Sequence, residues 1–151
     1  MSDLKRVLLA EDSPKDVELT LEALAENHLA NEVVVARDGA EAWAYLTRTG
    51  PFASRPAGNP AVVLLDLKMP KMDGLEVLRR MRADERLSAI PVVMLTSSRE
   101  ERDVVASYTS GVNAYVVKPV AFDDFISAVR NLGLFWAVLN QPPPGTARRA
   151  A

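Results

Sequence analysis

Polar and charged side chains stand at the ends of four of the five short apolar runs in this chain of 151 residues. In chain order they are Glu11 with Asp12, Asp66, Thr96 and Lys118. Three carboxylates gathered in one place repel one another and lose hydration, so a cation is needed to compensate their charge. The sequence has no cysteine and a single histidine, which leaves hard oxygen ligands and favours Mg²⁺ over Zn²⁺. We therefore predict a magnesium site in which Asp12 and Asp66 bind the ion directly and Glu11 binds it through water.

The elements that must bring these residues together follow from the hydrophobic pattern. Five apolar runs are expected to be strands, at residues 6–10, 32–36, 61–65, 91–95 and 114–117. Because most of them are apolar at consecutive positions, the strands should be buried on both faces of a parallel sheet. Segments with helical spacing of apolar residues alternate with them, at 14–27, around 42–46, from Gly74, at 99–111 and at 122–132. Five strand–helix units in succession imply a doubly wound α/β fold with right-handed crossovers.

In such a sheet, ligands bind beyond the carboxyl ends of the strands. An acid at any one of these positions alone would most simply be an exposed surface group. The placement of all of them at matching strand ends favours a binding site instead. The segment 48–61, rich in proline, glycine and small residues, is expected to be an irregular surface loop.

Composition limits the classes of partner. The chain is 48% hydrophobic and 25% charged, which fits one globular domain. A net charge of −2 and a pI near 5.5 give no broad attraction to nucleic acid or to anionic lipid. Neither a signal peptide nor an apolar run of roughly 20 residues is present, so we expect a soluble cytoplasmic protein with no nucleic acid or membrane partner.

Four motifs within residues 5–131 together resemble the receiver domain of two-component response regulators: LLAEDSP, VVLLDLKMPKMDG, PVVMLTSS and NAYVVKPV. The resemblance implies a CheY-like, flavodoxin-type fold, with a five-stranded parallel sheet in the order 2-1-3-4-5 and five helices. It also implies a cis Lys118–Pro119 bond. We expect a receiver domain at residues 1–131 and a C-terminal extension at 132–151, partly helical and then disordered.

The same resemblance assigns roles to single residues. In that family the aspartate ending the third strand accepts a phosphoryl group from the phosphohistidine of a histidine kinase, which implies Asp66. Lys118 matches the invariant lysine, Thr96 the switch hydroxyl and Tyr115 the switch aromatic, and the backbone carbonyl of Lys68 joins the metal ligands. The domain would catalyse its own phosphorylation and dephosphorylation without being an enzyme for a separate metabolite. We expect the charge on Lys68, near the pocket mouth, to alter the lifetime of the phosphoryl group.

The C-terminal end suggests how the signal leaves the domain. About twenty residues follow Asn131, too few for a DNA-binding domain, so output is expected through protein contacts. The segment NLGLFWAVLN is apolar on more than one helical side, which predicts a partner surface, although it could also fold back on its own domain. This end and the loop at 48–61 resemble the small single-domain response regulators of bacterial and cyanobacterial phytochromes. That implies a phytochrome histidine kinase as partner and a homodimer through the fourth helix, fifth strand, fifth helix and extension.

Two other classes of function stay open. A receiver-fold scaffold that is never phosphorylated would have no need for the intact set of Asp12, Asp66, Thr96 and Lys118. A flavodoxin-like cofactor binder would have a loop rich in glycine, serine or threonine after the first strand to hold a phosphate. This chain has the acidic AEDSPKD there, which would repel a phosphate in the absence of a metal.

Overall fold

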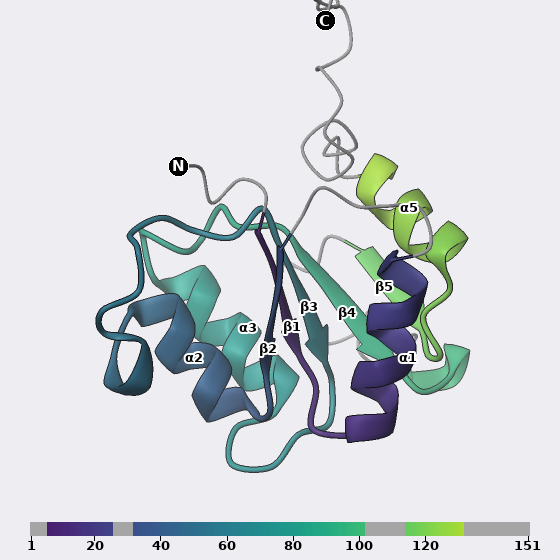
Figure 1. Ribbon diagram of the computed structural model, residues 1–151, viewed down its shortest axis with the longest axis horizontal. Coiled ribbons are helices and arrows are strands. Elements are labelled where there is room, and N and C mark those ends of the chain that lie inside the picture. The colour runs from purple at the N-terminus through teal and green to yellow at the C-terminus, as the bar shows by residue number, and fades with distance from the viewer. Residues whose placement is uncertain (1–5, 26–31, 102–113, 132–151) are drawn as a thin grey trace, which may run out of the picture.

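The computed structural model of the protein describes residues 6–25, 32–101 and 114–131. Its strands are β1 (Arg6–Ala10), β2 (Glu32–Ala36), β3 (Val62–Asp66), β4 (Val92–Thr96) and β5 (Ala114–Val117). They form one parallel sheet in the order β2-β1-β3-β4-β5 (Figure 1). The predicted fold class is confirmed. β3 and β4 each lie one residue further along than the pattern predicted, because the strand pairing extends to Asp66, opposite Leu95, and to Thr96, opposite Val117.

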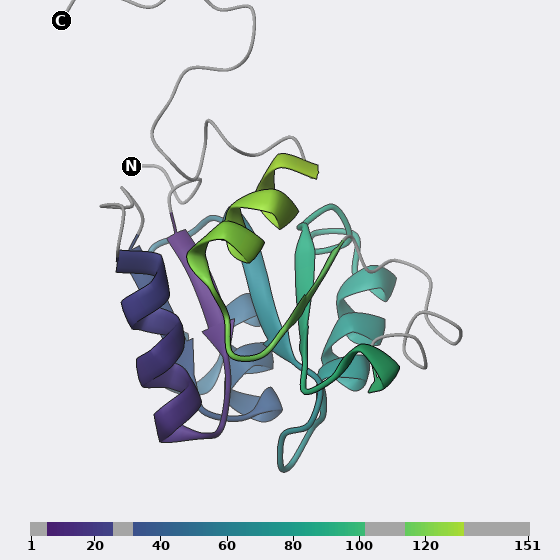
Figure 2. The same ribbon diagram turned by 90° about the vertical axis from the view of Figure 1, so that its right-hand side faces the viewer.

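Helices cover both faces of this sheet. They are α1 (Pro14–Ala25), α2 (Gly39–Thr47), α3 (Gly74–Ala83) and α5 (Phe122–Asn131), with a short 3-10 helix η2 (Gly50–Phe52). α2 and α3 lie on one face, and α1 and α5 lie on the other (Figures 1 and 2). Of the predicted helix at 99–111, residues 99–101 are helical and the rest lies outside the described residues, as does the segment 132–151. None of the helices described here has the length and apolar character needed to cross a membrane.

Alternate residues of the strands point into two hydrophobic cores, one on each side of the sheet. In β1, Leu8 belongs to the core under α2 and α3, whereas Leu9 belongs to the core under α1 and α5. β3 and β4 are buried at every position, as expected for central strands of a parallel sheet. Phe125 has no exposed surface and packs α5 onto the second core. The strand interiors are thus filled with apolar groups, and polar groups are left to the strand ends.

Two glycines allow close backbone contacts at the carboxyl edge of the sheet. A Cβ atom at Gly39 would lie 1.7 Å from the carbonyl oxygen of Met72, and one at Gly74 would lie 2.3 Å from the carbonyl oxygen of Asp66. The start of α2 therefore lies directly against the connection between β3 and α3. The start of α3 lies against the end of β3, which helps to fix the position of Asp66.

The loop at 48–61, predicted to be irregular, is fastened to α2 by Arg55. The guanidinium carbon of Arg55 lies 4.1 Å from the centre of the Tyr45 ring, and its Nε donates to the Tyr45 carbonyl oxygen at 2.7 Å. Its Nη1 donates to two further carbonyl oxygens of the loop. Phe52, in η2, packs edge-on against the same ring with 5.2 Å between the ring centres. The loop is therefore more ordered than its composition indicated, because one arginine satisfies two of its carbonyl groups and one of α2.

Candidate functional site

Glu11, Asp12 and Asp66 form an acidic cluster at the carboxyl edge of the sheet. One carboxylate oxygen from each lies within 4.8 Å of the other two. The cluster forms because β1 and β3 are neighbours, so that Asp66 lies beside the two residues that follow β1. Glu11 and Asp66 are buried and Asp12 is exposed, which opens the cluster to water on one side. Three hard oxygen donors in such a place fit a small divalent cation such as Mg²⁺, which keeps several of its waters in proteins.

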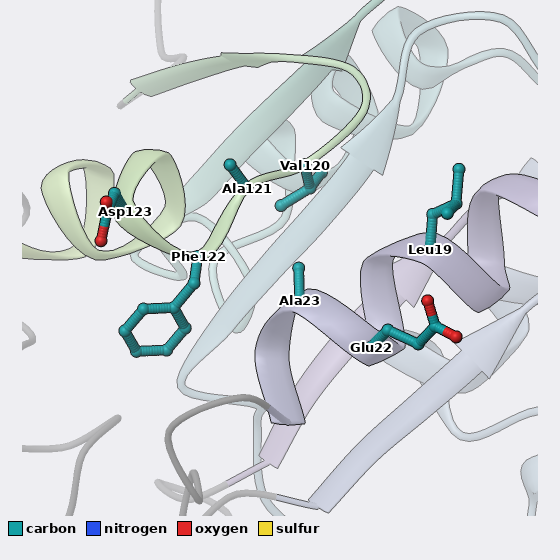
Figure 3. A pocket seen from close by; sticks show the side chains of 7 residues that line it. All are labelled: Leu19, Glu22, Ala23, Val120, Ala121, Phe122 and Asp123. Atoms are coloured by element: carbon teal, nitrogen blue, oxygen red, sulfur yellow. The ribbon is translucent and has the colours of Figure 1, made fainter.

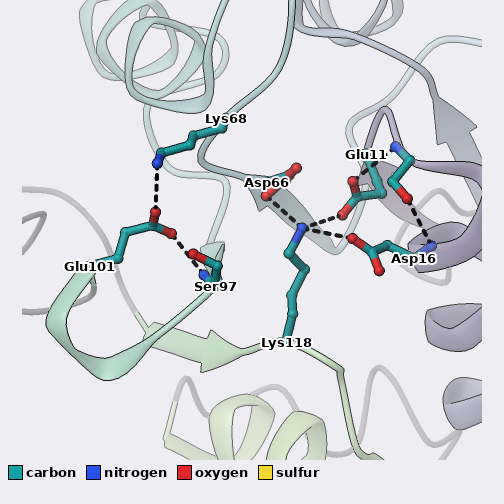
Figure 4. Close-up of polar contacts among 8 residues, drawn as sticks. Glu11, Asp16, Asp66, Lys68, Ser97, Glu101 and Lys118 are labelled. Carbon is teal, nitrogen blue, oxygen red and sulfur yellow. Dashed lines mark hydrogen bonds and ion pairs between the residues drawn. The ribbon is translucent and has the colours of Figure 1, made fainter.

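Lys118 extends into this cluster from the end of β5. Its Nζ donates to Glu11 Oε1 at 3.1 Å and to Asp16 Oδ2 at 3.1 Å, and it lies 3.2 Å from Asp66 Oδ1 (Figure 4). The Lys118–Pro119 peptide bond is cis, as the resemblance implied. The structure therefore brings together the acids and the lysine that were predicted from separate motifs.

Asp16 is a residue of this site that the sequence pattern did not predict. It lies in the first turn of α1, where an acid is ordinarily explained by its favourable interaction with the helix N-terminus. The available signal was the helix cap, since Ser13 Oγ accepts a hydrogen bond from the Asp16 backbone N–H at 3.3 Å. A capped helix that starts directly after Glu11 and Asp12 must hold its first-turn side chains at the same edge of the sheet.

Burial and neighbouring charges change the protonation of the site. Burial, and then the like charge of Glu11, raise the pKa of Asp66 to about 7, although Lys118 acts in the opposite direction. Burial alone would lower the pKa of Lys118, but its hydrogen bonds to Asp16 and Glu11 and the charge of Asp66 raise it. Without a bound metal ion, Lys118 therefore keeps its positive charge, while the raised pKa of Asp66 disfavours loss of its proton.

Thr96, the last residue of β4, has a buried hydroxyl. Its Oγ1 has no hydrogen-bond partner among the residues that the structure describes, and the residue is 0% exposed. Leaving such a group unpaired costs about 1–3 kcal/mol. The Thr96 carbonyl oxygen accepts a hydrogen bond from the Lys118 backbone N–H at 2.7 Å, which joins the ends of β4 and β5. The hydroxyl is available to an acceptor that a ligand would supply.

The side chain of Lys68 points away from Asp66 and toward the segment after β4. Its Nζ lies 3.3 Å from Glu101 Oε2, while Glu101 Oε1 accepts from the Ser97 backbone N–H at 2.7 Å (Figure 4). The lysine side chain is 82% exposed. This ion pair links the two connections that follow β3 and β4. The carbonyl of Lys68 as a metal ligand remains a prediction.

Tyr115 occupies an intermediate position in β5. It lies opposite Met94 of β4, is only partly buried, and packs against the core that contains α2 and α3. The switching role predicted for it therefore concerns a ring at the boundary between core and surface.

A separate hollow of about 380 Å³ lies between α1 and the connection from β5 to α5 (Figure 3). Its walls include the exposed side chain of Leu19 on α1 and the side chain of Phe122 at the start of α5. None of the residues of the acidic cluster lines it. It is thus a feature beside the site rather than part of it.

Comparison with known proteins agrees with this geometry. The family model of the response regulator receiver domain matches residues 7–130. The response regulator Rcp1 of Synechocystis sp. is 40% identical over 132 residues, which cover 87% of this chain and 88% of that protein. A crystal structure of Rcp1 in its Mn²⁺-bound form is similar to this structure with a TM-score of 0.69 at 37% identity, over 97% of this chain and 99% of that one.

Two solved bacteriophytochrome response regulators are more similar still. RtBRR has a TM-score of 0.85 at 61% identity, over 96% of this chain and 86% of that one. AtBRR has a TM-score of 0.85 at 62% identity, over 91% of this chain and 98% of that one.

Proposed function

Because the chain belongs to the family of response regulator receiver domains, we propose that Asp66 accepts a phosphoryl group from the phosphohistidine of a sensor histidine kinase. The observation that carries this proposal is the position of Asp66, which lies within one acidic cluster with Glu11 and Asp12 and is paired with Lys118. Phosphoryl transfer depends mainly on positioning and on compensation of charge, and these residues supply both.

In the proposed step a carboxylate oxygen of Asp66 bonds to phosphorus while the bond from phosphorus to the kinase imidazole nitrogen breaks. The electron pair of that bond stays on the imidazole. Glu11, Asp12, Asp66 and the backbone carbonyl of Lys68 would hold the cation. When bound, Mg²⁺ offsets the negative charge on the phosphoryl oxygens and on the acids. Lys118 stabilises the charge that spreads over the equatorial oxygens, since its ammonium already lies 3.2 Å from Asp66 Oδ1.

The buried hydroxyl of Thr96, which has no partner among the described residues, supports the proposed switch. Phosphorylation adds negative charge and acceptor oxygens next to Asp66, and Thr96 Oγ1 can donate to one of them. This new contact favours a conformation in which the segment after β4 moves toward the phosphoryl group and Tyr115 turns inward. Phosphorylation can change the ratio of the two conformations only by as much as the interaction energy of the phosphoryl group differs between them.

The identities of 61% and 62% with bacteriophytochrome response regulators suggest the pathway. We propose that the kinase is a phytochrome histidine kinase and that transfer takes place in the cytoplasm. Output would pass through protein contacts, in a homodimer that uses the segment after β4, β5, α5 and residues 132–151.

The proposal is tested with acetyl phosphate and Mg²⁺ followed by intact mass measurement. Wild type should gain the mass of one phosphoryl group, and Asp66→Ala should gain none. Asp123→Asn, which removes an exposed carboxylate from α5, is the control and should behave like wild type. Failure of wild type to gain the mass, or an equal gain in Asp66→Ala, would overturn the proposal and favour a scaffold that is not phosphorylated. Transfer from a phytochrome kinase under red and far-red light then tests the pathway.

A further inference from the structure

Asp16 is a carboxylate that contacts the reactive lysine without belonging to the acidic cluster. Among the described residues, Lys118 Nζ has three carboxyl partners at nearly equal distances, namely Glu11, Asp16 and Asp66. Glu11 and Asp66 are also members of the cluster that could hold a metal ion, and Asp16 is not. Of the three partners, Asp16 alone has a carboxylate that is not shared with the metal site.

Asp16 is held in place by a closed circuit of hydrogen bonds at the start of α1. Glu11 Oε2 accepts from the Ser13 backbone N–H at 3.1 Å, and Ser13 Oγ accepts from the Asp16 backbone N–H at 3.3 Å. Lys118 closes the circuit by donating to both Glu11 and Asp16 (Figure 4). Because the helix cap fixes the Asp16 backbone at the start of α1, the side chain begins from a defined position, and its carboxylate accepts from Lys118.

A cation in the acidic cluster changes the environment of Lys118. It attracts the oxygens of Glu11 and Asp66 and repels the ammonium group, because like charges a few ångströms apart in a partly buried site interact strongly. Two of the three partners of Lys118 are then weakened together. The ammonium must either leave the site or stay bound to Asp16.

We propose that Asp16 is a positioning residue, which keeps the Lys118 ammonium beside Asp66 while a divalent cation occupies the cluster. Its consequence for phosphoryl transfer rests on the proposed function, whereas retention of the ammonium does not. With Asp16 in place, Lys118 is ready for the phosphoryl oxygens at the moment of transfer. Without it, Mg²⁺ binding and the position of Lys118 oppose each other.

The direct test follows the NMR signal of the Lys118 ammonium group in the full chain during titration with Mg²⁺, assigned by its absence in Lys118→Arg. The signal should persist at saturating Mg²⁺ in wild type and disappear in Asp16→Asn. Asp16→Glu, which keeps a carboxylate, should retain it at least in part. Glu18→Gln is the matched control, since it removes an exposed acid from the same helix. A signal in Asp16→Asn that persists as in wild type overturns the proposal.

A kinetic test uses acetyl phosphate at saturating Mg²⁺. Asp16→Asn should lower the limiting rate of phosphorylation about tenfold, the usual effect of losing one charged hydrogen bond, while Glu18→Gln stays within about twofold. In a Lys118→Ala background the Asp16→Asn change should have no further effect. If Asp16→Asn lowers the rate of phosphorylation equally with and without Lys118, Asp16 acts through its negative charge and not by positioning Lys118. That result would contradict the proposal. If wild type takes no phosphoryl group at all, the proposed function fails, and the NMR titration still decides the role of Asp16.

Discussion

At the scale of single residues, the charge on Asp66 opposes folding of the metal-free protein. Its pKa is raised from 3.8 to about 7, so the folded state binds more protons than the unfolded state between these values. The contribution of this group to stability is therefore fully present below the unfolded pKa and is lost as the pH rises toward about 7. The proposed phosphoryl acceptor thus reduces the stability of the protein at neutral pH.

This linkage predicts the behaviour of Asp66→Asn in a buffer with a metal chelator. The variant cannot ionise, so its advantage over wild type in the free energy of unfolding should grow by about 2 kcal/mol between about pH 5 and about pH 8. Urea unfolding at both pH values measures it, with Asp123→Asn as the control. A difference in the free energy of unfolding between the variant and wild type that does not change with pH would contradict the raised pKa of Asp66. Added Mg²⁺ should reduce the advantage, because the cation gains a carboxylate ligand in the ionised wild type that the variant lacks.

The buried hydroxyl of Thr96 is a cost to the stability of the unphosphorylated protein. Thr96→Val removes a buried hydroxyl that has no partner among the described residues, so it should raise the free energy of unfolding by about 1 kcal/mol in the unphosphorylated protein. Thr47→Val is the comparison, because Thr47 Oγ1 donates to the Trp43 carbonyl oxygen at 2.7 Å and its loss should be neutral or destabilising. Thermal unfolding of both variants gives the measurement. Equal destabilisation in the two would mean that Thr96 Oγ1 has a partner in the native protein.

At the scale of elements, the connection from β3 to α3 depends on its contact with α2. Gly39→Ala would place a Cβ atom 1.7 Å from the Met72 carbonyl oxygen, so this connection must shift. We expect a loss of about 3 kcal/mol in the free energy of unfolding. Gly50→Ala is the matched control: its φ of +54° disfavours a side chain but nothing lies within 4 Å, and about 1 kcal/mol should be lost. Urea unfolding measures the free energy of unfolding of both variants. An equal loss in the two would mean that the close contact between Gly39 and Met72 is not the cause.

The ion pair between Lys68 and Glu101 links the connection that follows Asp66 at the end of β3 to the connection that follows β4. Lys68→Asn should shorten the lifetime of the phosphoryl group by about two- to fivefold, the range that an exposed ion pair can contribute, since water then reaches the site more easily. The control is Lys71→Asn in the same connection, which breaks the pairing with Asp38 at 3.5 Å on the far side. Loss of the phosphoryl mass with time gives both lifetimes. Unchanged dephosphorylation in Lys68→Asn would refute the expected effect of its charge.

At the scale of the whole molecule, the sheet and the positions of the predicted site residues followed from sequence for a physical reason. Strands buried on both faces require consecutive apolar residues, so the polar residues that end them stand out in the sequence. Asp16 and Arg55 could not be predicted in this way. An acid in a first helical turn and an arginine in a loop rich in proline each have an ordinary local explanation. Their partners, Lys118 and Tyr45, are known only from the folded structure.

The predicted homodimer is also a property of the whole molecule. Removal of residues 132–151 should convert the protein to a monomer, because only Asn131 of the apolar segment NLGLFWAVLN then remains. Removal of only the tail 141–151 is the control and should leave the dimer intact. Sedimentation velocity distinguishes the two species. A dimer that survives the longer deletion would place the contact elsewhere.

The hydrogen bonds of Lys118 to Glu11 and Asp16 join positions that are 107 and 102 residues apart in the chain. Contacts of such long sequence separation close large loops at an entropic cost, so they are stable only when the chain between them is ordered. In an incompletely folded chain the acids of the first strand–helix unit are therefore not held beside the ammonium group that completes the site. The proposed phosphoryl transfer is in this way tied to completed folding, because its lysine and its acids meet only in the folded chain.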